Sequence, residues 1–188
     1  MTYISSDTNV WIDFMIIDSM ELPFRLPYTF IMSEEAVEDE LLSPPGLGEQ
    51  LTSLGLVSVE NTIDEFLLAD EYGNRYKKLS VYDRIALAIA KCRNITLLTG
   101  DRALRKAARR ESVNVIGTLG IIDQLFDQDM ITTKEYETCL KRLQANNGKG
   151  IRLPEVEIIS RLQQVIRSGR GIRLMPLKDR SIKSFGNL

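Results

Sequence analysis

The chain has 188 residues, 44% of them apolar, which is enough for one domain with a single hydrophobic core. It lacks the run of about 18 apolar residues that a membrane helix needs, shows no secretory signal pattern, and contains no histidine, which excludes His-dependent triads and the usual catalytic zinc sites. The only cysteines, Cys92 and Cys139, lie far apart, which predicts a reducing, cytoplasmic location without a disulfide framework.

The net charge is only -2, but the charges are unevenly distributed. Residues 1–75 carry 15 acidic and 2 basic side chains, whereas residues 76–110 carry 2 acidic and 10 basic ones. Residues 151–188 are also basic, with 8 basic and 3 acidic side chains. Such blocks indicate a site that gathers cations beside a surface that attracts polyanions. A solvated helix face is the alternative explanation of each block.

Short apolar segments alternate with helical patterns along the chain, which is typical of βα units in an α/β protein with a parallel sheet. Neither GxGxxG nor a P-loop is present, which argues against dinucleotide and NTP binding. Gly73-Asn74 are expected to end the fourth helix. The predicted strands cover residues 3–5, 28–32, 56–59, 95–99 and 113–116, and the predicted helices begin at Val10 and cover 33–42, 48–54, 63–72, 80–92, 102–110, 119–126, 132–145 and 155–167.

Three helix starts have a capping-box pattern, in which a Ser or Thr is followed three residues later by an acid. The pairs are Thr62 with Glu65, Ser80 with Asp83, and Thr132 with Glu135. Beyond Gly150 the composition changes: an amphipathic helix is followed by a basic, weakly patterned tail. We expect residues 151–188 to pack on the preceding domain or to contact a partner.

Four acidic residues recur at similar places in this pattern. Asp7 follows the first strand, Glu40 lies on the helix after the second, Asp83 is in the first turn of its helix, and Asp101 follows the strand that ends at Thr99. Strand ends and helix starts of a parallel sheet share one edge, so at least three of these acids are expected to meet there. A divalent cation offsets the repulsion of converging carboxylates, and oxygen ligands favour Mg²⁺ or Mn²⁺. Singly, each acid is also explained as a helix cap or as solvated surface.

Six stretches of the chain form a specific set in this order: Ile4-Ser5-Ser6-Asp7-Thr8-Asn9, Val37-Glu38-Asp39-Glu40-Leu41, Tyr82-Asp83-Arg84-Ile85-Ala86-Leu87-Ala88, Leu97-Leu98-Thr99-Gly100-Asp101, Gly117-Thr118-Leu119-Gly120-Ile121-Ile122 and Asp129-Met130-Ile131-Thr132. Together they resemble the PIN-domain family, whose members include the VapC-type metal-dependent ribonucleases. The resemblance spans about residues 2–145, and its C-terminal part is similar to one bacterial and archaeal subgroup with a GTLG motif.

The resemblance implies a three-layer α/β/α domain over residues 1–150, with a central, mainly parallel sheet of about five strands. It implies that Asp7, Glu40, Asp83 and Asp101 are the catalytic, metal-binding acids, and that Asn9 and Thr99 support them. Glu34 and Glu38 are rivals to Glu40. The implied activity is Mg²⁺- or Mn²⁺-dependent hydrolysis of single-stranded or structured RNA. An antitoxin partner and a homodimer are implied by the same likeness.

Basic residues near these acids are candidates for holding RNA phosphates. They are Arg84, Arg102, Arg105, Lys106, Arg109 and Arg110, to which Lys77 and Lys78 add. Two other functions stay open. One is a catalytically silent PIN-fold scaffold or a module that binds nucleic acid or protein. The other is a receiver-like domain with Asp7 as phosphate acceptor, which the missing lysine after the late strand argues against.

Overall fold

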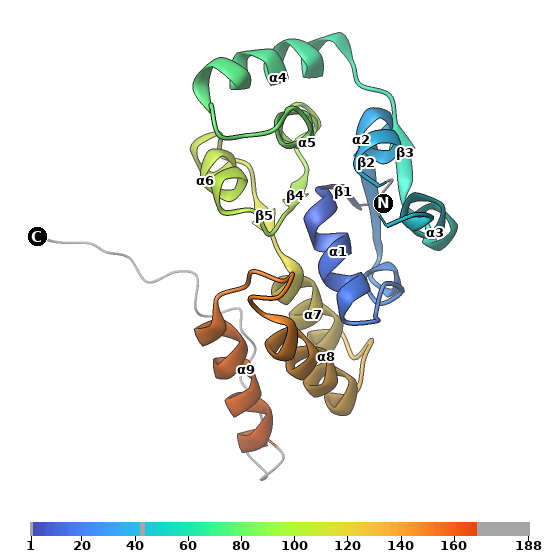
Figure 1. The fold of residues 1–188 in the computed structure, drawn as a ribbon, viewed down its shortest axis with the longest axis vertical. Coiled ribbons are helices and arrows are strands. Elements are labelled where there is room, and N and C mark those ends of the chain that lie inside the picture. Colours follow the sequence, from blue (N-terminus) through green and yellow to red (C-terminus); the bar gives the residue numbers. More distant parts are fainter. Residues whose placement is uncertain (1, 42–43, 169–188) are drawn as a thin grey trace, which may run out of the picture.

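The computed structural model describes residues 2–41 and 44–168. Within these residues the chain forms one five-stranded sheet in the order β3-β2-β1-β4-β5 (Figure 1). All neighbouring strands run parallel, so the predicted α/β class is confirmed and the mainly parallel sheet is fully parallel. The strands are β1 (Thr2–Ser6), β2 (Tyr28–Ser33), β3 (Val57–Val59), β4 (Thr96–Leu98) and β5 (Val115–Ile116).

The strand order places β1 at the centre of the sheet. The chain first adds β2 and β3 on one side of β1, and then returns to add β4 and β5 on the other. Ser6 pairs with Leu98, so β1 and β4 end side by side. In an open parallel sheet, ligands bind outside the carboxyl ends of the strands where the strand order reverses. A ligand is therefore expected to bind at the sheet edge where β1 and β4 end.

Helices cover both faces of the sheet, which gives the predicted three layers. In Figure 1, α4, α5 and α6 lie above the sheet, and α1, α7 and α8 lie below it. The helices are α1 (Thr8–Ile16), α2 (Glu34–Asp39), α3 (Leu47–Leu54), α4 (Ile63–Arg75), α5 (Val81–Cys92), α6 (Arg102–Arg110), α7 (Thr118–Asp127), α8 (Thr133–Asn146) and α9 (Glu155–Ser168), with a short 3-10 turn at Pro23–Arg25.

Each face of the sheet builds its own hydrophobic core. Ile4, Phe30 and Leu98 belong to the core shared with α1, α7 and α8. Ile31 and Leu97 belong to the core shared with α4, α5 and α6. Successive strand residues point to opposite faces, so the short apolar runs of β2 and β4 supply both cores at once. This arrangement explains why these strands appear in the sequence as continuous apolar runs.

The three predicted capping boxes are present. Thr62, Ser80 and Thr132 each accept a hydrogen bond from the backbone N–H three residues later, and the acid at that position accepts one from the backbone N–H of the cap. Each box satisfies two backbone donors that a helix start otherwise leaves unpaired. The capping pattern thus placed the starts of α4, α5 and α8 correctly.

The predicted end of the fourth helix was wrong. Gly73 and Asn74 do not break α4, which continues to Arg75. A side chain at Gly73 would collide with the guanidinium group of Arg84 from α5. The missing side chain at Gly73 therefore leaves space for Arg84 between α4 and α5. The helix α4 continues through this glycine.

The helix predicted for residues 33–42 is shorter than expected. Ser33 caps α2 as predicted, because its hydroxyl accepts a hydrogen bond from the N–H of Ala36. The helix ends at Asp39, and Glu40 is its C-cap. Glu40 leaves the helix at the point where its carboxylate reaches Thr8 on α1. The end of α2 therefore coincides with a side-chain contact that is distant in sequence.

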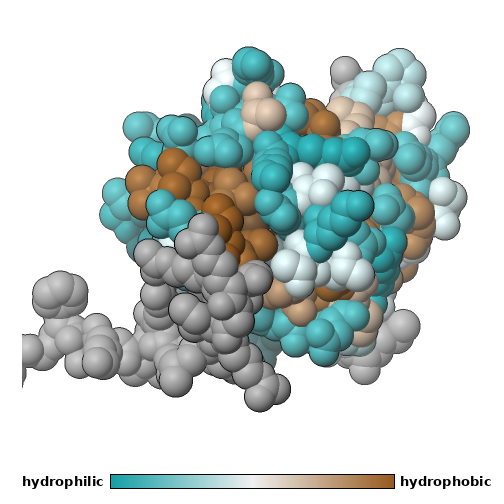
Figure 2. Space-filling view, turned by 90° about the horizontal axis from the view of Figure 1, so that it is seen from below, coloured by the Kyte–Doolittle hydropathy of each residue, from teal (hydrophilic) through white to brown (hydrophobic). Residues whose placement is uncertain are grey.

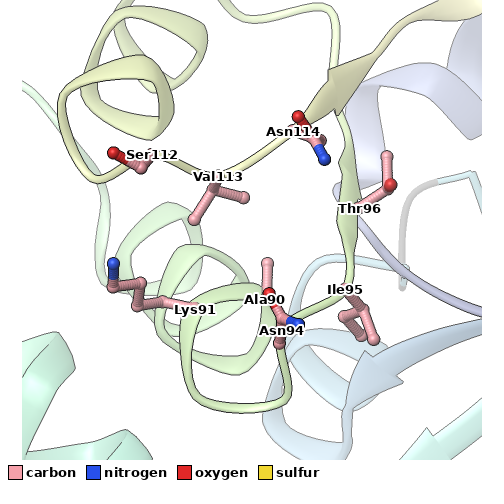
Figure 3. Close-up of a pocket in the computed structure, with 8 residues that line it drawn as sticks. All are labelled: Ala90, Lys91, Asn94, Ile95, Thr96, Ser112, Val113 and Asn114. Carbon is pink, nitrogen blue, oxygen red and sulfur yellow. The ribbon is translucent and has the colours of Figure 1, made fainter.

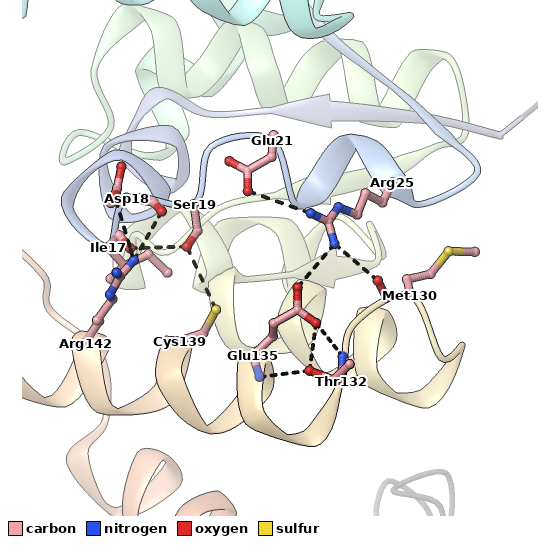
Figure 4. A network of polar contacts seen from close by, with 10 residues as sticks. All are labelled: Ile17, Asp18, Ser19, Glu21, Arg25, Met130, Thr132, Glu135, Cys139 and Arg142. Carbon is pink, nitrogen blue, oxygen red and sulfur yellow. Dashed lines mark hydrogen bonds and ion pairs between the residues drawn. The ribbon is translucent and has the colours of Figure 1, made fainter.

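Polar contacts fasten α8 to the segment that follows α1 (Figure 4). The guanidinium group of Arg142 donates to the carbonyl oxygen of Ile17 at 2.6 Å. Arg25 donates to the carbonyl oxygen of Met130 and pairs with Glu135. The N-terminal helix and α8 therefore belong to one structural unit, although more than 100 residues separate these partners.

The helix α9 packs on this unit through Ile158 and Val165, which are buried in the core shared with α1, α7 and α8. Its other side exposes Val156, Ile159 and Ile166. Seen from below, the surface carries brown, apolar areas between teal, polar ones (Figure 2).

The basic tail from residue 169 onward lies outside the described residues. No helix in the described part of the chain has the length and apolar character needed to span a membrane.

Candidate active site

Asp7 lies at the end of β1, in the N-cap position of α1, but its side chain does not cap that helix. The carboxylate oxygen Oδ2 instead accepts hydrogen bonds from the Thr99 hydroxyl at 2.7 Å and from the Asn9 amide at 2.5 Å. The side chain is buried, with only 8% of the residue exposed. Asp7 therefore does not serve as a helix cap, and its carboxylate is bound by Thr99 and Asn9 instead.

The turn after β4 is tied to the start of α1 by the same polar residues. The Thr99 hydroxyl accepts a hydrogen bond from the N–H of Asp101 at 3.0 Å, and the N–H of Gly100 donates to Asn9 Oδ1 at 3.0 Å. Asp101 caps α6 through the N–H of Leu104. Asn9 and Thr99 thus link the two strand ends on which Asp7 and Asp101 stand.

The other two predicted acids come from α5 and from the end of α2. Asp83 is the third residue of α5 and completes the capping box with Ser80. Glu40 accepts a hydrogen bond from the Thr8 hydroxyl at 2.6 Å. Its two rivals, Glu34 and Glu38, are exposed on α2. Among these three glutamates, the geometry thus favours Glu40.

Electrostatic effects connect the four carboxylates. The pKa of Asp7 is raised to about 7, mainly by burial and also by the nearby charges of Asp83, Glu40 and Asp101, against the lowering effect of the Thr99 hydrogen bond. Burial also raises the pKa of Glu40 and of Asp83, and Asp83 in turn adds to the rise at Glu40. The charge of each acid thus acts on at least one of the others, and the meeting of all four at one edge of the sheet stays a prediction.

The chemistry of these donors fits a hard divalent cation. All four are carboxylates, and Asp7 Oδ1 accepts no hydrogen bond from the described residues. Within residues 2–41 and 44–168, no three His, Cys, Asp or Glu side chains stand close enough to hold a metal ion between them. Mg²⁺ keeps several waters and often binds through only one or two carboxylates. The four residues thus offer the oxygen donors that such an ion prefers, but the described side chains do not enclose a position for it.

A family model for a PIN domain matches residues 3–167. The chain belongs to the PIN-domain family. The match includes α9, which lies beyond the predicted domain end at residue 150. Neither a curated protein nor a solved structure matches the chain. PIN domains are generally nucleases that use divalent metals, so membership gives this chain a nuclease-type fold.

Asp13 of this PIN domain is a buried acid that sequence reasoning missed. It lies one helical turn after Asn9 on α1, and its carboxylate accepts a hydrogen bond from Thr118 at the start of α7. Its Oδ2 lies 4.0 Å from the position that a Cβ on Gly100 would occupy. The spacing of Asn9 and Asp13 puts both on one helix face, which was the available signal. Asp13 thus joins α1 to the start of α7, close to the turn at Gly100.

The six predicted RNA-binding residues form no ion pair with any described residue. Arg102, Lys106 and Arg109 are exposed on α6, whose Leu104 faces the core. Arg105 is half-buried. Arg84 is also half-buried, and Arg110 is exposed. These basic residues and the four acids thus form no ion pairs with each other, so the basic and acidic blocks of the sequence stay separate in charge.

A cavity of about 120 Å³ lies at the other end of β4 and β5 (Figure 3). It is lined by side chains at the strand starts and at the ends of α5 and α6, such as Lys91, Thr96 and Asn114. None of the four acids lines it. The cavity is therefore separate from the carboxylate site of the PIN domain.

The metal-free PIN domain should lose stability as pH rises. The folded state raises the pKa of Asp7 from 3.8 to about 7, so it binds this proton more tightly than the unfolded chain does. The stabilisation is complete below about pH 4 and is lost as pH rises through 7, a change on the order of 4 kcal/mol. Urea unfolding in EDTA between pH 4 and pH 8 measures it. Asp7→Asn should flatten this part of the profile, and superimposable profiles for the two proteins would contradict the account.

Proposed function

We propose that this PIN domain is a Mg²⁺- or Mn²⁺-dependent endoribonuclease that hydrolyses phosphodiester bonds. The observation that supports it best is the electrostatic coupling of Asp7 to Glu40, Asp83 and Asp101 at the switch point of the sheet. Strongly perturbed carboxylates in such a position are typical of catalytic sites.

In this proposal Asp7, Asp83 and Asp101 would hold the cation, with Glu40 bound directly or through water. The ion would supply a water of lowered pKa and positive charge beside the scissile phosphate. The protein contributes orientation: Thr99 and Asn9 hold the Asp7 carboxylate, and Thr8 holds that of Glu40. No side-chain nucleophile is needed, which agrees with a chain that contains no histidine.

A cleavage assay on single-stranded RNA with Mg²⁺ or Mn²⁺ tests the activity. Asp7→Asn and Asp83→Asn should remove cleavage, as should EDTA. Asp64→Asn is the matched control, because it removes an exposed carboxylate in the first turn of α4. Cleavage that survives in both site variants would overturn the assignment, because the activity would then come from another site or from a contaminant.

RNA binding should depend on the unpaired basic residues. We expect Lys106→Met combined with Arg109→Met to weaken RNA binding and to reduce the salt dependence of log Kd by up to about one per lost phosphate contact. Fluorescence anisotropy in EDTA at several salt concentrations measures both effects. Lys141→Met is the control for the loss of a surface cation away from α6, since Lys141 pairs with Glu137 on α8. An unchanged salt slope would exclude these residues from RNA contact.

The likeness to VapC-type proteins supports a more specific proposal, namely that the chain is the cytoplasmic toxin of a toxin–antitoxin pair and forms a homodimer. Expression of the wild type should then arrest bacterial growth, and expression of Asp7→Asn should not. Equal growth with both proteins, at equal protein levels, would remove the toxin proposal and leave the nuclease proposal standing.

The second candidate is a catalytically silent PIN-fold scaffold that binds nucleic acid or protein. The wide spacing of the described acids favours it. Thermal unfolding with millimolar Mn²⁺ separates the two candidates, because a ligand bound only by the folded state raises stability. A rise in Tm that Asp7→Asn abolishes supports the nuclease, and no rise supports the scaffold.

A further inference from the structure

Arg105 differs from the other basic residues of α6. Its side chain is half-buried, and its guanidinium Nη1 donates a hydrogen bond to the carbonyl oxygen of Thr99 at 2.9 Å. It forms no ion pair with any acid in residues 2–41 and 44–168. The hydrogen bond to Thr99 is therefore the polar contact that fixes this guanidinium group among the described residues.

Gly117 provides the space for this contact. A Cβ at Gly117 would lie 2.9 Å from Arg105 Nη1 and 3.3 Å from the carbonyl oxygen of Thr99. The φ of Gly117 is -129°, which any residue adopts. The glycine, which is the first residue of the GTLG stretch, thus leaves space that a Cβ would share with the guanidinium group, and its backbone conformation does not need a glycine.

Thr99 connects this contact to the acids. Arg105 holds the Thr99 carbonyl group, while the Thr99 hydroxyl donates to Asp7 and accepts from the N–H of Asp101. Both ends of the residue are therefore fixed, and one threonine sets the positions of two acids on neighbouring strand ends. Partners that orient metal-binding groups in this way commonly change metal affinity or activity 10- to 100-fold when they are removed.

We propose that Arg105 is a positioning residue, which acts through Thr99 to hold Asp7 and Asp101 in place for the cation, and that Gly117 exists to admit its guanidinium group. The inference rests on the proposed function, in which Asp7 and Asp101 hold the cation, and Mn²⁺ affinity and RNA cleavage are measured separately. It separates Arg105 from Lys106 and Arg109, whose exposed side chains suit direct contact with RNA.

Three variants test the role of Arg105. Arg105→Met removes the donor, Gly117→Ala displaces it while every charge is kept, and Arg105→Lys keeps the charge without the forked geometry. We expect Arg105→Met and Gly117→Ala to weaken Mn²⁺ binding about 10-fold by calorimetry and to lower kcat about 10- to 100-fold. KM and the RNA Kd in EDTA should change less than about threefold, and Arg105→Lys should recover part of the loss.

Arg109→Met and Lys141→Met complete the experiment. Arg109→Met should raise KM with little effect on Mn²⁺ affinity, and Lys141→Met should change neither. A rise in KM at unchanged kcat and Mn²⁺ affinity in Arg105→Met would overturn the proposal in favour of an RNA anchor. Failure of both Arg105→Met and Gly117→Ala to fold would overturn it in favour of a structural contact. If the wild type cuts no RNA, the proposed function fails while the Mn²⁺ affinities still decide this inference.

Discussion

Asp7→Asn should abolish catalysis and stabilise the metal-free protein at the same time. The carboxylate is buried beside three other acids, and its pKa is raised to about 7. The asparagine removes this repulsion but can still accept the hydrogen bond from the Thr99 hydroxyl. At pH 8 in EDTA we expect the free energy of unfolding to rise by about 2 kcal/mol, which is half or less of the maximum that the pKa difference allows.

The activity of the same variant should fall on the order of 10²- to 10³-fold, as it does when other groups that stabilise transition-state charge are removed. RNA cleavage and urea unfolding on one preparation measure both effects. Asp64→Asn is again the control, and it should change neither quantity. A variant that loses both activity and stability would show that Asp7 serves the fold and not the chemistry.

Breaking the ion pair between Asp123 and Arg161 should have the largest effect on stability. Arg161 of α9 donates to both carboxylate oxygens of Asp123 on α7, at 2.7 to 3.0 Å, and the Tyr136 hydroxyl donates to Asp123 as well. Only 14% of the Arg161 side chain and 11% of the Asp123 side chain are exposed. Arg161→Met leaves a buried carboxylate without its cation, which should cost about 3–5 kcal/mol.

Urea unfolding of Arg161→Met and of Asp123→Leu combined with Arg161→Met measures this effect. The double variant should recover most of the loss, because an apolar pair of similar size often replaces a buried ion pair without cost. Lys141→Met removes an exposed ion pair on α8 and should change stability by less than about 1 kcal/mol. A loss below 1 kcal/mol in Arg161→Met would mean that α9 is held by its apolar contacts, such as those of Ile158 and Val165, and not by the ion pair.

Much of the fold was predictable from local patterns. Apolar runs such as 95–99 indicate buried strands, and the capping boxes at Thr62, Ser80 and Thr132 fix three helix starts with backbone chemistry alone. The end of α4 was not predictable, because Gly73 is retained for contact with Arg84. A glycine that breaks a helix and one that admits a neighbour look alike in sequence.

The acids of the candidate site were predicted from their places in the pattern, and their joint role stays a prediction; the contacts around them were not predicted. Strand ends marked Asp7 and Asp101, because the end of a parallel strand has a known position in the sheet. Glu40 stood among other acids, and only its contact with Thr8 distinguishes it. The roles of Asp13 and Arg105 depend on partners more than five residues away, namely Thr118 and Thr99. Such contacts leave no local periodicity to detect.

The central claim is that Asp7, Asp83 and Asp101, with Glu40, hold a divalent cation. A crystal structure of the protein soaked in Mn²⁺, with anomalous scattering to locate the ion, tests it most directly. We predict one ion bound by Asp7, or two ions about 4 Å apart, each with the remaining acids as ligands directly or through water. Mn²⁺ bound elsewhere, with Asp7 still joined only to Thr99 and Asn9, would contradict the account.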